Sequence, residues 1–116
     1  MKKVILDTDF IINCLKNKID ILEELRNLLD INYKVYIIDK TIDELKNKPL
    51  ENLAKKFVKK VSIIQTKKDK SVDDLVLEQK DAIVATQDKG LKEKLKKAKI
   101  PIITIRQKKY LKCFTK

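Results

Sequence analysis

Histidine is absent from this chain of 116 residues, and glycine occurs only once. Without histidine, a Ser-His-Asp triad, a Cys-His pair and any histidine-ligated metal site are excluded. The single glycine, Gly90, cannot build the glycine-rich loops of dinucleotide-binding or P-loop nucleotide sites. Cys14 and Cys113 are too few for a disulfide framework or a four-cysteine zinc site, so we expect reduced, packed thiols.

Long apolar runs are also missing. The N-terminal run 4–6 is far too short for a signal peptide. No stretch of the chain approaches the roughly 20 apolar residues that a membrane-spanning helix needs. We therefore expect a soluble, cytoplasmic protein with no membrane partner.

The charges are numerous and unevenly divided by sign. The chain contains 28 Lys and Arg residues against 17 Asp and Glu, a formal net charge of +11. This excess favours a polyanionic partner, nucleic acid ahead of an anionic membrane surface. A lysine-rich surface that only keeps the protein soluble is the alternative interpretation.

The apolar residues predict a single domain, 1–116, with a core at 4–105 and a basic C-terminal tail at 106–116. Short strands are predicted at 4–6, 35–38, 61–65, 83–85 and 102–105. Helices are predicted through residue 30, with Asp20 as a cap, and at 41–47, 49–60, 73–80 and 88–98. This alternation predicts an α/β fold with a central parallel five-stranded sheet and helices on both faces.

Acidic residues follow each of the first four predicted strands. They occur in Asp7-Thr8-Asp9, Asp43-Glu44, Asp73-Asp74 and Thr86-Gln87-Asp88. Because ligands bind at the carboxyl ends of parallel strands, we expect these acids at one edge of the sheet. Taken singly, Asp9, Asp73 and Asp88 also suit helix N-caps, and Glu44 suits a solvated helix position. Gathered in one cleft, the carboxylates would repel one another unless a cation lay among them.

Carboxylate oxygens are the preferred ligands of hard divalent cations such as Mg²⁺ and Mn²⁺. One or two such ions within a basic surface suit the hydrolysis of a phosphodiester. The lysines would hold backbone phosphates, while the ions would activate water and stabilise the leaving oxygen. The sequence therefore favours metal-dependent cleavage of a nucleic acid.

Five segments, in order, resemble the signatures of the PIN-domain nucleases. They are VILDTDFII at 4–12, YIIDKTIDELK at 36–46, DDLV at 73–76, IVATQDKGL at 83–91 and IPII at 100–103. The resemblance implies a PIN fold and a metal-dependent endoribonuclease that cleaves single-stranded RNA. It also implies a catalytic and metal-binding quartet of Asp7, Glu44, Asp74 and Asp88. Thr86 would orient this site through a hydrogen bond.

The chain departs from the family pattern at two places. Asp9 stands where the family usually has Asn or Ser, and it would be an additional outer ligand. The interval from Asp74 to Asp88 is about one helical turn shorter than usual, which leaves the choice between Asp73 and Asp74 open.

The resemblance also implies partners. A compact chain of this kind fits a VapC-type toxin with an antitoxin protein as partner, or a nuclease that processes a ribosomal RNA precursor. Four basic residues make the chain somewhat more similar to the processing branch, and they are candidates for RNA contacts: Lys89, Arg106, Lys108 and Lys109. Homodimers are frequent in the family.

Two other functions compete with this interpretation. The first is a non-catalytic PIN-fold module that binds RNA, although such a module has no reason to keep mutually repelling acids. The second is a haloacid-dehalogenase-like phosphatase, because Asp7-Thr8-Asp9 resembles the opening motif of that family. Phe10 stands where that motif requires glycine, and the chain is short for the remaining phosphatase motifs.

Overall fold

A computed structural model describes residues 1–114, so the last two residues of the expected basic tail lie outside the described residues. The strands are β1 (Lys2–Leu6), β2 (Tyr33–Ile38), β3 (Ser62–Ile64), β4 (Ala82–Ala85), β5 (Ile102–Arg106) and β6 (Tyr110–Phe114). The helices are α1 (Thr8–Lys16), α2 (Ile21–Leu28), α3 (Asp39–Leu45), α4 (Glu51–Val58), α5 (Val72–Leu77) and α6 (Lys89–Lys97). The predicted strands and helices are therefore present, with their ends shifted by a few residues.

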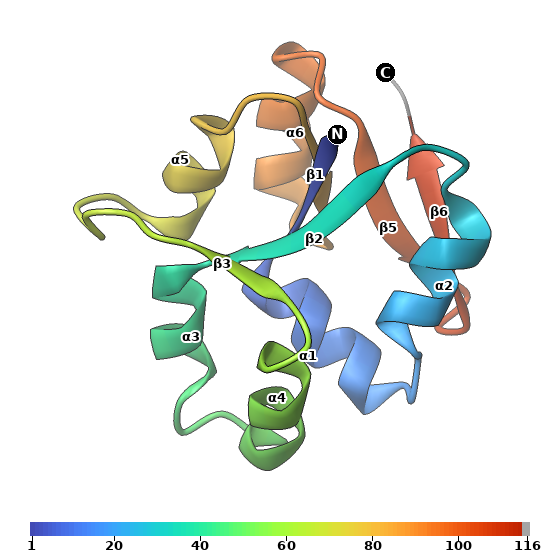
Figure 1. Cartoon of the computed structure of the whole chain (residues 1–116), viewed down its shortest axis with the longest axis vertical. Helices are drawn as coiled ribbons and strands as arrows, with labels where there is room; N and C mark the ends of the chain where they lie inside the picture. Colours follow the sequence, from blue (N-terminus) through green and yellow to red (C-terminus); the bar gives the residue numbers. More distant parts are fainter. Residues whose placement is uncertain (115–116) are drawn as a thin grey trace.

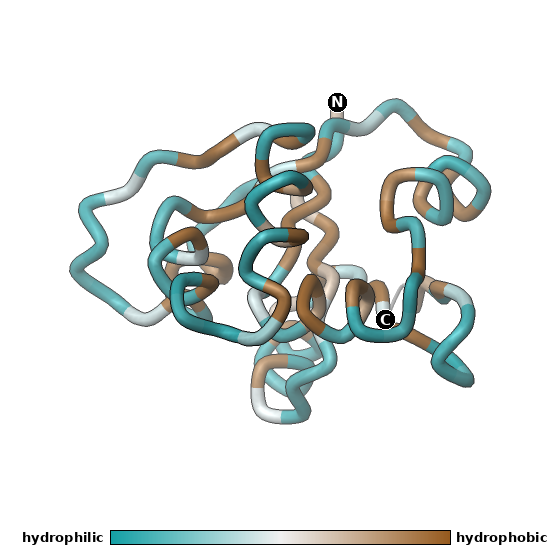
Figure 2. Tube along the Cα trace, turned by 90° about the horizontal axis from the view of Figure 1, so that it is seen from below, coloured by the Kyte–Doolittle hydropathy of each residue, from teal (hydrophilic) through white to brown (hydrophobic). Residues whose placement is uncertain are grey.

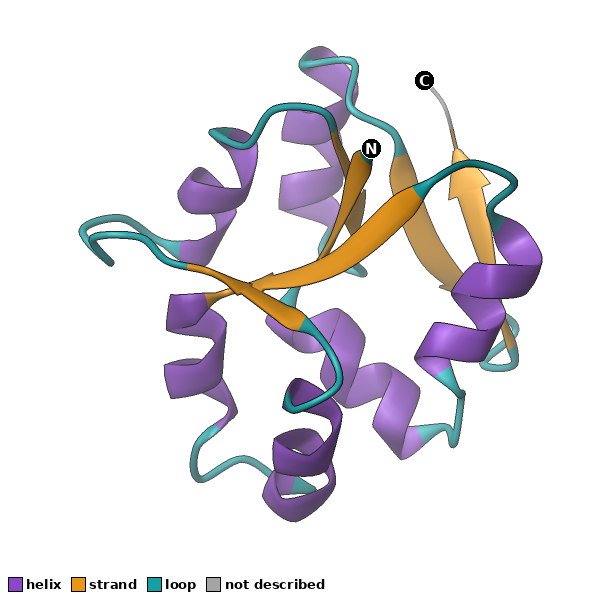
Figure 3. Ribbon diagram, in the orientation of Figure 1, coloured by secondary structure: helices purple, strands orange, loops and turns teal. Residues whose placement is uncertain are grey.

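The strands form one sheet in the order β3-β2-β1-β4-β5-β6 (Figure 1). The first five strands are parallel, and β6 runs antiparallel to β5 (Figure 3). The predicted α/β fold with a parallel core is confirmed, but the prediction of five strands was wrong because the tail adds a sixth. Gln107 and Lys108 adopt positive φ angles of 52° and 54°, and the amide of Lys109 donates to the carbonyl of Arg106 at 3.0 Å. This tight turn sends the tail back along β5.

Helices cover both faces of the sheet, as the alternation predicted. Along β1, Val4 and Leu6 enter one hydrophobic core and Ile5 enters the other, because successive side chains of a strand point to opposite faces. The first core lies against α1–α4 and includes Phe10, Leu25, Leu45 and Phe57. The second lies against α5 and α6 and includes Val76, Leu91 and Leu95. Figure 2 shows hydrophobic and hydrophilic segments alternating along the helices.

The ends of β1 and β4 lie side by side at the centre of the sheet. β1 pairs with both β2 and β4, so the chain builds outward on one side of β1 and then crosses to the other. This point is the topological switch of the parallel sheet, where ligands of such folds bind. Residues that follow β1 and β4 are therefore placed next to one another.

Three aspartates cap helices through their side chains. Asp7 accepts a hydrogen bond from the amide of Thr8 at the start of α1, and Asp88 accepts one from the amide of Leu91 in α6. Asp20 caps α2 as predicted. The caps of α1 and α6 therefore fix acidic side chains at the carboxyl edge of the sheet.

Asp9 and Asp73, for which N-capping was the alternative interpretation, do not cap helices. Asp9 lies in the first turn of α1, because that helix begins directly after Asp7. Asp73 lies in the first turn of α5, because Ser71 is the cap and accepts from the amide of Asp74. The helix predicted at 49–60 begins at Glu51, so Pro49 precedes it.

Both cysteines are free thiols, as predicted. Cys14 is completely buried, and this burial raises the pKa of its thiol to about 12. Burial also raises the pKa of Cys113. Among the helices of residues 1–114, none combines the length and the apolar composition that crossing a membrane requires.

Candidate functional site

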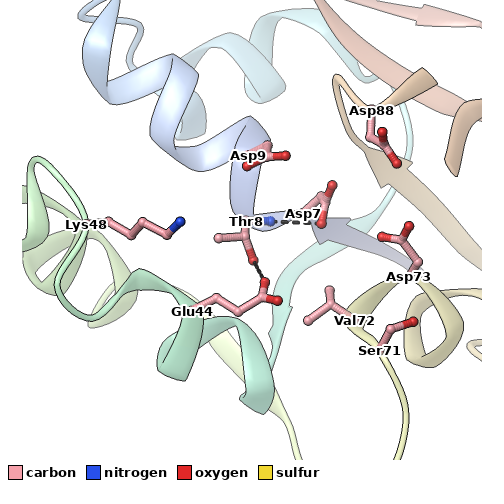
Figure 4. Close-up of a pocket in the computed structure, with 9 residues that line it drawn as sticks. All are labelled: Asp7, Thr8, Asp9, Glu44, Lys48, Ser71, Val72, Asp73 and Asp88. Atoms are coloured by element: carbon pink, nitrogen blue, oxygen red, sulfur yellow. Dashed lines mark hydrogen bonds between the residues drawn. The ribbon is translucent and has the colours of Figure 1, made fainter. Parts of the chain in front are cut away.

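A cavity of about 430 Å³ opens at the carboxyl edge of the parallel strands. Its lining residues are Asp7, Thr8, Asp9, Glu44, Lys48, Ser71, Val72, Asp73 and Asp88 (Figure 4). Five of these nine residues are acidic, and they come from the β1–α1 junction, α3, the start of α5 and the β4–α6 loop. The fold thus brings carboxylates from four separate segments to one place.

Asp7 lies at the end of β1, and only 5% of its surface is exposed. One carboxylate oxygen accepts from the amide of Thr8 at 3.0 Å, and the other accepts from the hydroxyl of Thr86 at 2.9 Å. Burial raises the pKa of Asp7 to about 6; the charge of Asp73 adds to the rise, and the Thr86 hydrogen bond opposes it. Burial and the nearby charge of Asp73 therefore both disfavour the ionised form of Asp7.

Thr86 is completely buried at the end of β4. Its hydroxyl donates to Asp7 and accepts from the amide of Asp88 at 3.1 Å. One side chain therefore connects the acid that follows β1 to the loop that carries the acid after β4. This contact gives the predicted orienting residue a structural basis.

Glu44 reaches the cavity from the exposed side of α3. The hydroxyl of Thr8 donates to its carboxylate at 2.5 Å, and the same hydroxyl is hydrogen-bonded to that of Thr41 at 3.3 Å. Thr8 and Thr41 are both buried, so they form a fixed support beneath Glu44. Neither threonine was singled out from the sequence, although Thr8 directly follows Asp7 in the quoted motif.

The third acid in the cavity is Asp73 and not Asp74. Consecutive residues of a helix point about 100° apart, so only one of this pair can face the cavity. Asp73 lines it, whereas Asp74 is exposed and does not. Partial burial raises the pKa of Asp73, and the negative charge of Asp88 adds to the rise. The sequence left the choice between Asp73 and Asp74 open, and the lining of the cavity favours Asp73 as the candidate for the third acid.

Lys48 also lines the cavity, and Figure 4 shows its ammonium group pointing toward the acidic side chains. It lies between α3 and α4, where the chain carries lysines at 46 and 48. Nothing in the sequence distinguished Lys48 from the many other lysines. It supplies a positive charge to a site that is otherwise acidic.

Of the remaining candidates, Asp9 belongs to this cavity and the four basic residues do not line it. Asp9 lines it from an exposed position in α1. Lys89 opens α6 beside Asp88 without lining the acidic cavity, and Lys108 and Lys109 lie exposed in the β5–β6 turn. Arg106 lines a separate cavity on the same side of β5 as α6.

The donor set fits a hard divalent cation. The charged donors of the cavity are carboxylates, with no sulfur or imidazole among the lining residues. Burial disfavours the ionised form of Asp7, and a nearby positive charge would favour it. Across residues 1–114, no three acidic or cysteine side chains are already gathered closely enough to hold an ion. The carboxylates would therefore have to close around a bound ion.

Comparisons with known proteins agree with the fold and the motifs. Residues 4–108 match the sequence family described as PIN like domain. The chain is 32% identical over 128 aligned positions to Ribonuclease VapC4 of Methanocaldococcus jannaschii, covering 98% of each chain. It also resembles the structure of the PIN domain endonuclease Utp24, with a TM-score of 0.81 and 29% identity over 98% of this chain and 92% of that chain.

Proposed function

The chain belongs to the PIN-like domain family, and we propose that it is a metal-dependent endoribonuclease that cleaves single-stranded RNA. The convergence of Asp7, Glu44, Asp73 and Asp88 on one cavity is the observation that carries this proposal. A ribonuclease and an endonuclease among the similar proteins support the same class of reaction.

Asp7, Glu44, Asp73 and Asp88 would hold one or two Mg²⁺ or Mn²⁺ ions, with Asp9 as an outer acid. When bound, such an ion stabilises the negative charge that develops on phosphate oxygens and makes water more acidic. The proposal rests on the carboxylate chemistry of the cavity and on the burial of Asp7 among other acids.

The side chains of the protein supply orientation and proton transfer. Thr86 and the amide of Thr8 fix both oxygens of Asp7, and the hydroxyl of Thr8 fixes Glu44. The ammonium of Lys48 is placed to attract a phosphate oxygen. Because the chain has no histidine, an ionised carboxylate of the cavity or bulk water accepts the proton of the attacking water.

The surface charge supports RNA as the substrate. A net charge of +11 attracts a polyanion, even though the cavity itself is acidic. An acidic cavity without a cation would repel the phosphate that must be cleaved. The contrast between surface and cavity is therefore consistent with a reaction that needs a divalent ion.

A cleavage assay tests the proposal. Labelled single-stranded RNA would be incubated with the wild-type chain in Mg²⁺, in Mn²⁺ or in chelator, and with Asp7→Asn. We expect cleavage only with metal, and a loss of about 100-fold or more in Asp7→Asn, since an activating carboxylate is removed. Asp20→Asn is the matched control, because it removes the same charge at a helix cap outside the cavity and asparagine also caps helices. Equal cleavage by wild type and Asp7→Asn contradicts the proposal.

Binding of RNA without cleavage in either metal would instead identify a non-catalytic RNA-binding module. Hydrolysis of a small phosphomonoester without RNA cleavage would identify a phosphatase. Each alternative therefore has its own outcome in assays on the same preparation.

We propose two cellular settings for the activity, both in the cytoplasm. In one, the chain is a toxin that an antitoxin protein inhibits; in the other, it processes a ribosomal RNA precursor. Growth arrest on expression, absent in Asp7→Asn, supports the first setting, and accumulation of precursor on deletion supports the second. Light scattering of the purified chain tests the homodimer that is frequent in the family.

A further inference from the structure

A second cavity, of about 460 Å³, lies between α6 and the C-terminal strand pair. Its lining residues are Gln87, Lys92, Lys96, Ile102, Thr104, Ile105, Arg106 and Phe114. The charged residues among them are all cations, in contrast to the acidic cavity. Gln87 lines this cavity and the next residue, Asp88, lines the acidic one, so the β4–α6 loop contributes a residue to each cavity.

The cations of this cavity have no acidic partners in the described part of the chain. The ion pairs found within residues 1–114 use other lysines, at 46, 55, 68 and 70. The ammonium of Lys92 donates to the hydroxyl of Thr104 at 3.1 Å. Partial burial lowers the pKa of Lys92, the charges of Arg106 and Lys96 lower it further, and Asp88 opposes them. The cations therefore lie close enough to repel one another.

Hydrogen bonds within this cavity occupy the acceptor oxygens of Gln87 and Thr104. The side-chain oxygen of Gln87 accepts from the amide of Ile105 at 2.7 Å and also from the hydroxyl of Thr104. Because an amide N–H must be a donor, this contact assigns the oxygen of Gln87 and leaves its NH₂ group to donate elsewhere. Thr104 has donated its proton to Gln87 and accepts from Lys92. The cavity thus offers ammonium, guanidinium and amide donors.

Arg106 is held in position by an aromatic ring. Its guanidinium carbon lies 5.0 Å from the centroid of Phe114, and the ammonium of Lys112 lies 5.5 Å from the same centroid. A guanidinium over a ring is favourably placed and keeps its N–H edge free for hydrogen bonds. A planar fork of donors beside an ammonium group is the combination that binds phosphate oxygens.

We propose that this cavity, lined by Lys92, Lys96 and Arg106, is a subsite for a backbone phosphate of the RNA, next to the phosphate that is cleaved. This proposal rests on the proposed function. It adds the path that the RNA strand takes across the β4–α6 loop. The subsite binds the phosphate and not the base, so its contribution is independent of RNA sequence.

The test measures binding without cleavage. A short labelled single-stranded RNA of mixed sequence is titrated with the wild-type chain in EDTA over a series of salt concentrations. The variant Lys92→Gln/Arg106→Gln is compared with Lys2→Gln/Lys97→Gln. The control pair loses the same charge from exposed positions that line neither cavity. Circular dichroism and thermal unfolding establish that each variant is folded.

We expect the subsite variant to bind RNA about 10-fold more weakly. The slope of the logarithm of its affinity against the logarithm of the salt concentration should decrease in magnitude by about 0.7 for each phosphate that the variant no longer neutralises. The control pair should bind less than about twofold more weakly and keep its slope, and Lys92→Arg should bind nearly as wild type. Equal decreases in affinity in the subsite and control variants overturn the proposal. Because the chelator prevents metal-dependent cleavage, a failure of the proposed function appears only in the cleavage assay and not here.

An acidic protein is the competing ligand for such a cavity. Polyglutamate is therefore titrated against the same variants under the same conditions. We expect it to bind weakly and equally to both double variants. Tight polyglutamate binding that is abolished in Lys92→Gln/Arg106→Gln would assign the cavity to an acidic protein partner and overturn the RNA subsite.

Discussion

The hydroxyl of Thr86 lies 2.9 Å from a carboxylate oxygen of Asp7, although the two residues are 79 positions apart in the sequence. The contact joins the ends of the two central strands, and the same hydroxyl holds the amide of Asp88. Thr86 is therefore the residue that aligns the first and last acids of the site. Its side chain can be tested separately from the acids themselves.

Thr86→Val keeps the shape of the side chain but removes the hydrogen-bond donor to Asp7. Because that hydrogen bond opposes the rise in the pKa of Asp7, the variant should raise this pKa above its present value of about 6. The acidic limb of the pH profile of kcat/KM should move to higher pH. Removal of a hydrogen bond to a carboxylate corresponds to about a 10- to 100-fold decrease in kcat/KM. Thr86→Ser retains the donor. Identical acidic limbs in the pH profiles of Thr86→Val and Thr86→Ser would therefore contradict the role of this hydrogen bond in setting the pKa of Asp7.

Asp7 should make the stability of the metal-free protein depend on pH. Its pKa is about 6 in the folded state against 3.8 for an unperturbed Asp, so the folded state binds this proton more tightly. The free energy of unfolding should therefore rise as the pH falls from about 7 to about 4. The full effect of this group is up to about 3 kcal/mol, since each pKa unit corresponds to about 1.4 kcal/mol.

Urea unfolding in EDTA at several pH values measures this effect. Asp7→Asn should lack this contribution. The free energy of unfolding of the wild type minus that of the variant should therefore increase as the pH decreases. Asp73 titrates in the same direction in both proteins, so the comparison reports Asp7 together with its electrostatic coupling to Asp73. A difference that is constant with pH would show that Asp7 titrates normally.

A divalent ion should stabilise the wild-type fold at neutral pH. Adding Mn²⁺ at about 100 times its dissociation constant should raise the free energy of unfolding by about 2.7 kcal/mol. Asp7→Asn should gain much less, because a buried acid of the cavity is removed, and Asp20→Asn should respond as the wild type does. Thermal unfolding with and without Mn²⁺ gives the comparison. Equal responses in all three proteins would place ion binding outside the cavity.

The adjacent pair Asp73 and Asp74 offers a matched test of the third acid. Asp73→Asn should reduce kcat/KM by about 100-fold or more, because this side chain faces the other acids. Asp74→Asn removes the same charge from an exposed position and should change kcat/KM by less than about threefold, since exposed charges interact weakly. The reverse order of effects would restore Asp74 as the third acid.

The sequence predicted the parts of the fold that depend on regular patterns. Short apolar strands alternating with helices were sufficient for a parallel sheet, and acids after four strands were sufficient to expect them at one edge. The sixth strand was missed because the turn at Gln107 and Lys108 uses positive φ angles without glycine, asparagine or aspartate. The local sequence therefore carried no turn signal.

The details of the two cavities depend on tertiary packing. Asp73 faces the site only because Ser71 caps α5, which a run of adjacent acids does not reveal. Lys92 and Arg106 become neighbours because α6 packs beside β5. In a chain with 28 Lys and Arg residues, no pattern marks the few cations that meet in a cavity.

The most direct test of the central claim is a crystal of the full chain soaked in Mn²⁺, with anomalous diffraction recorded to locate the ions. The account predicts one or two manganese peaks in the acidic cavity, contacting the carboxylate of Asp7 and those of at least two of Glu44, Asp73 and Asp88. An acidic cavity without a manganese peak, in crystals where the ion binds elsewhere on the chain, would contradict it.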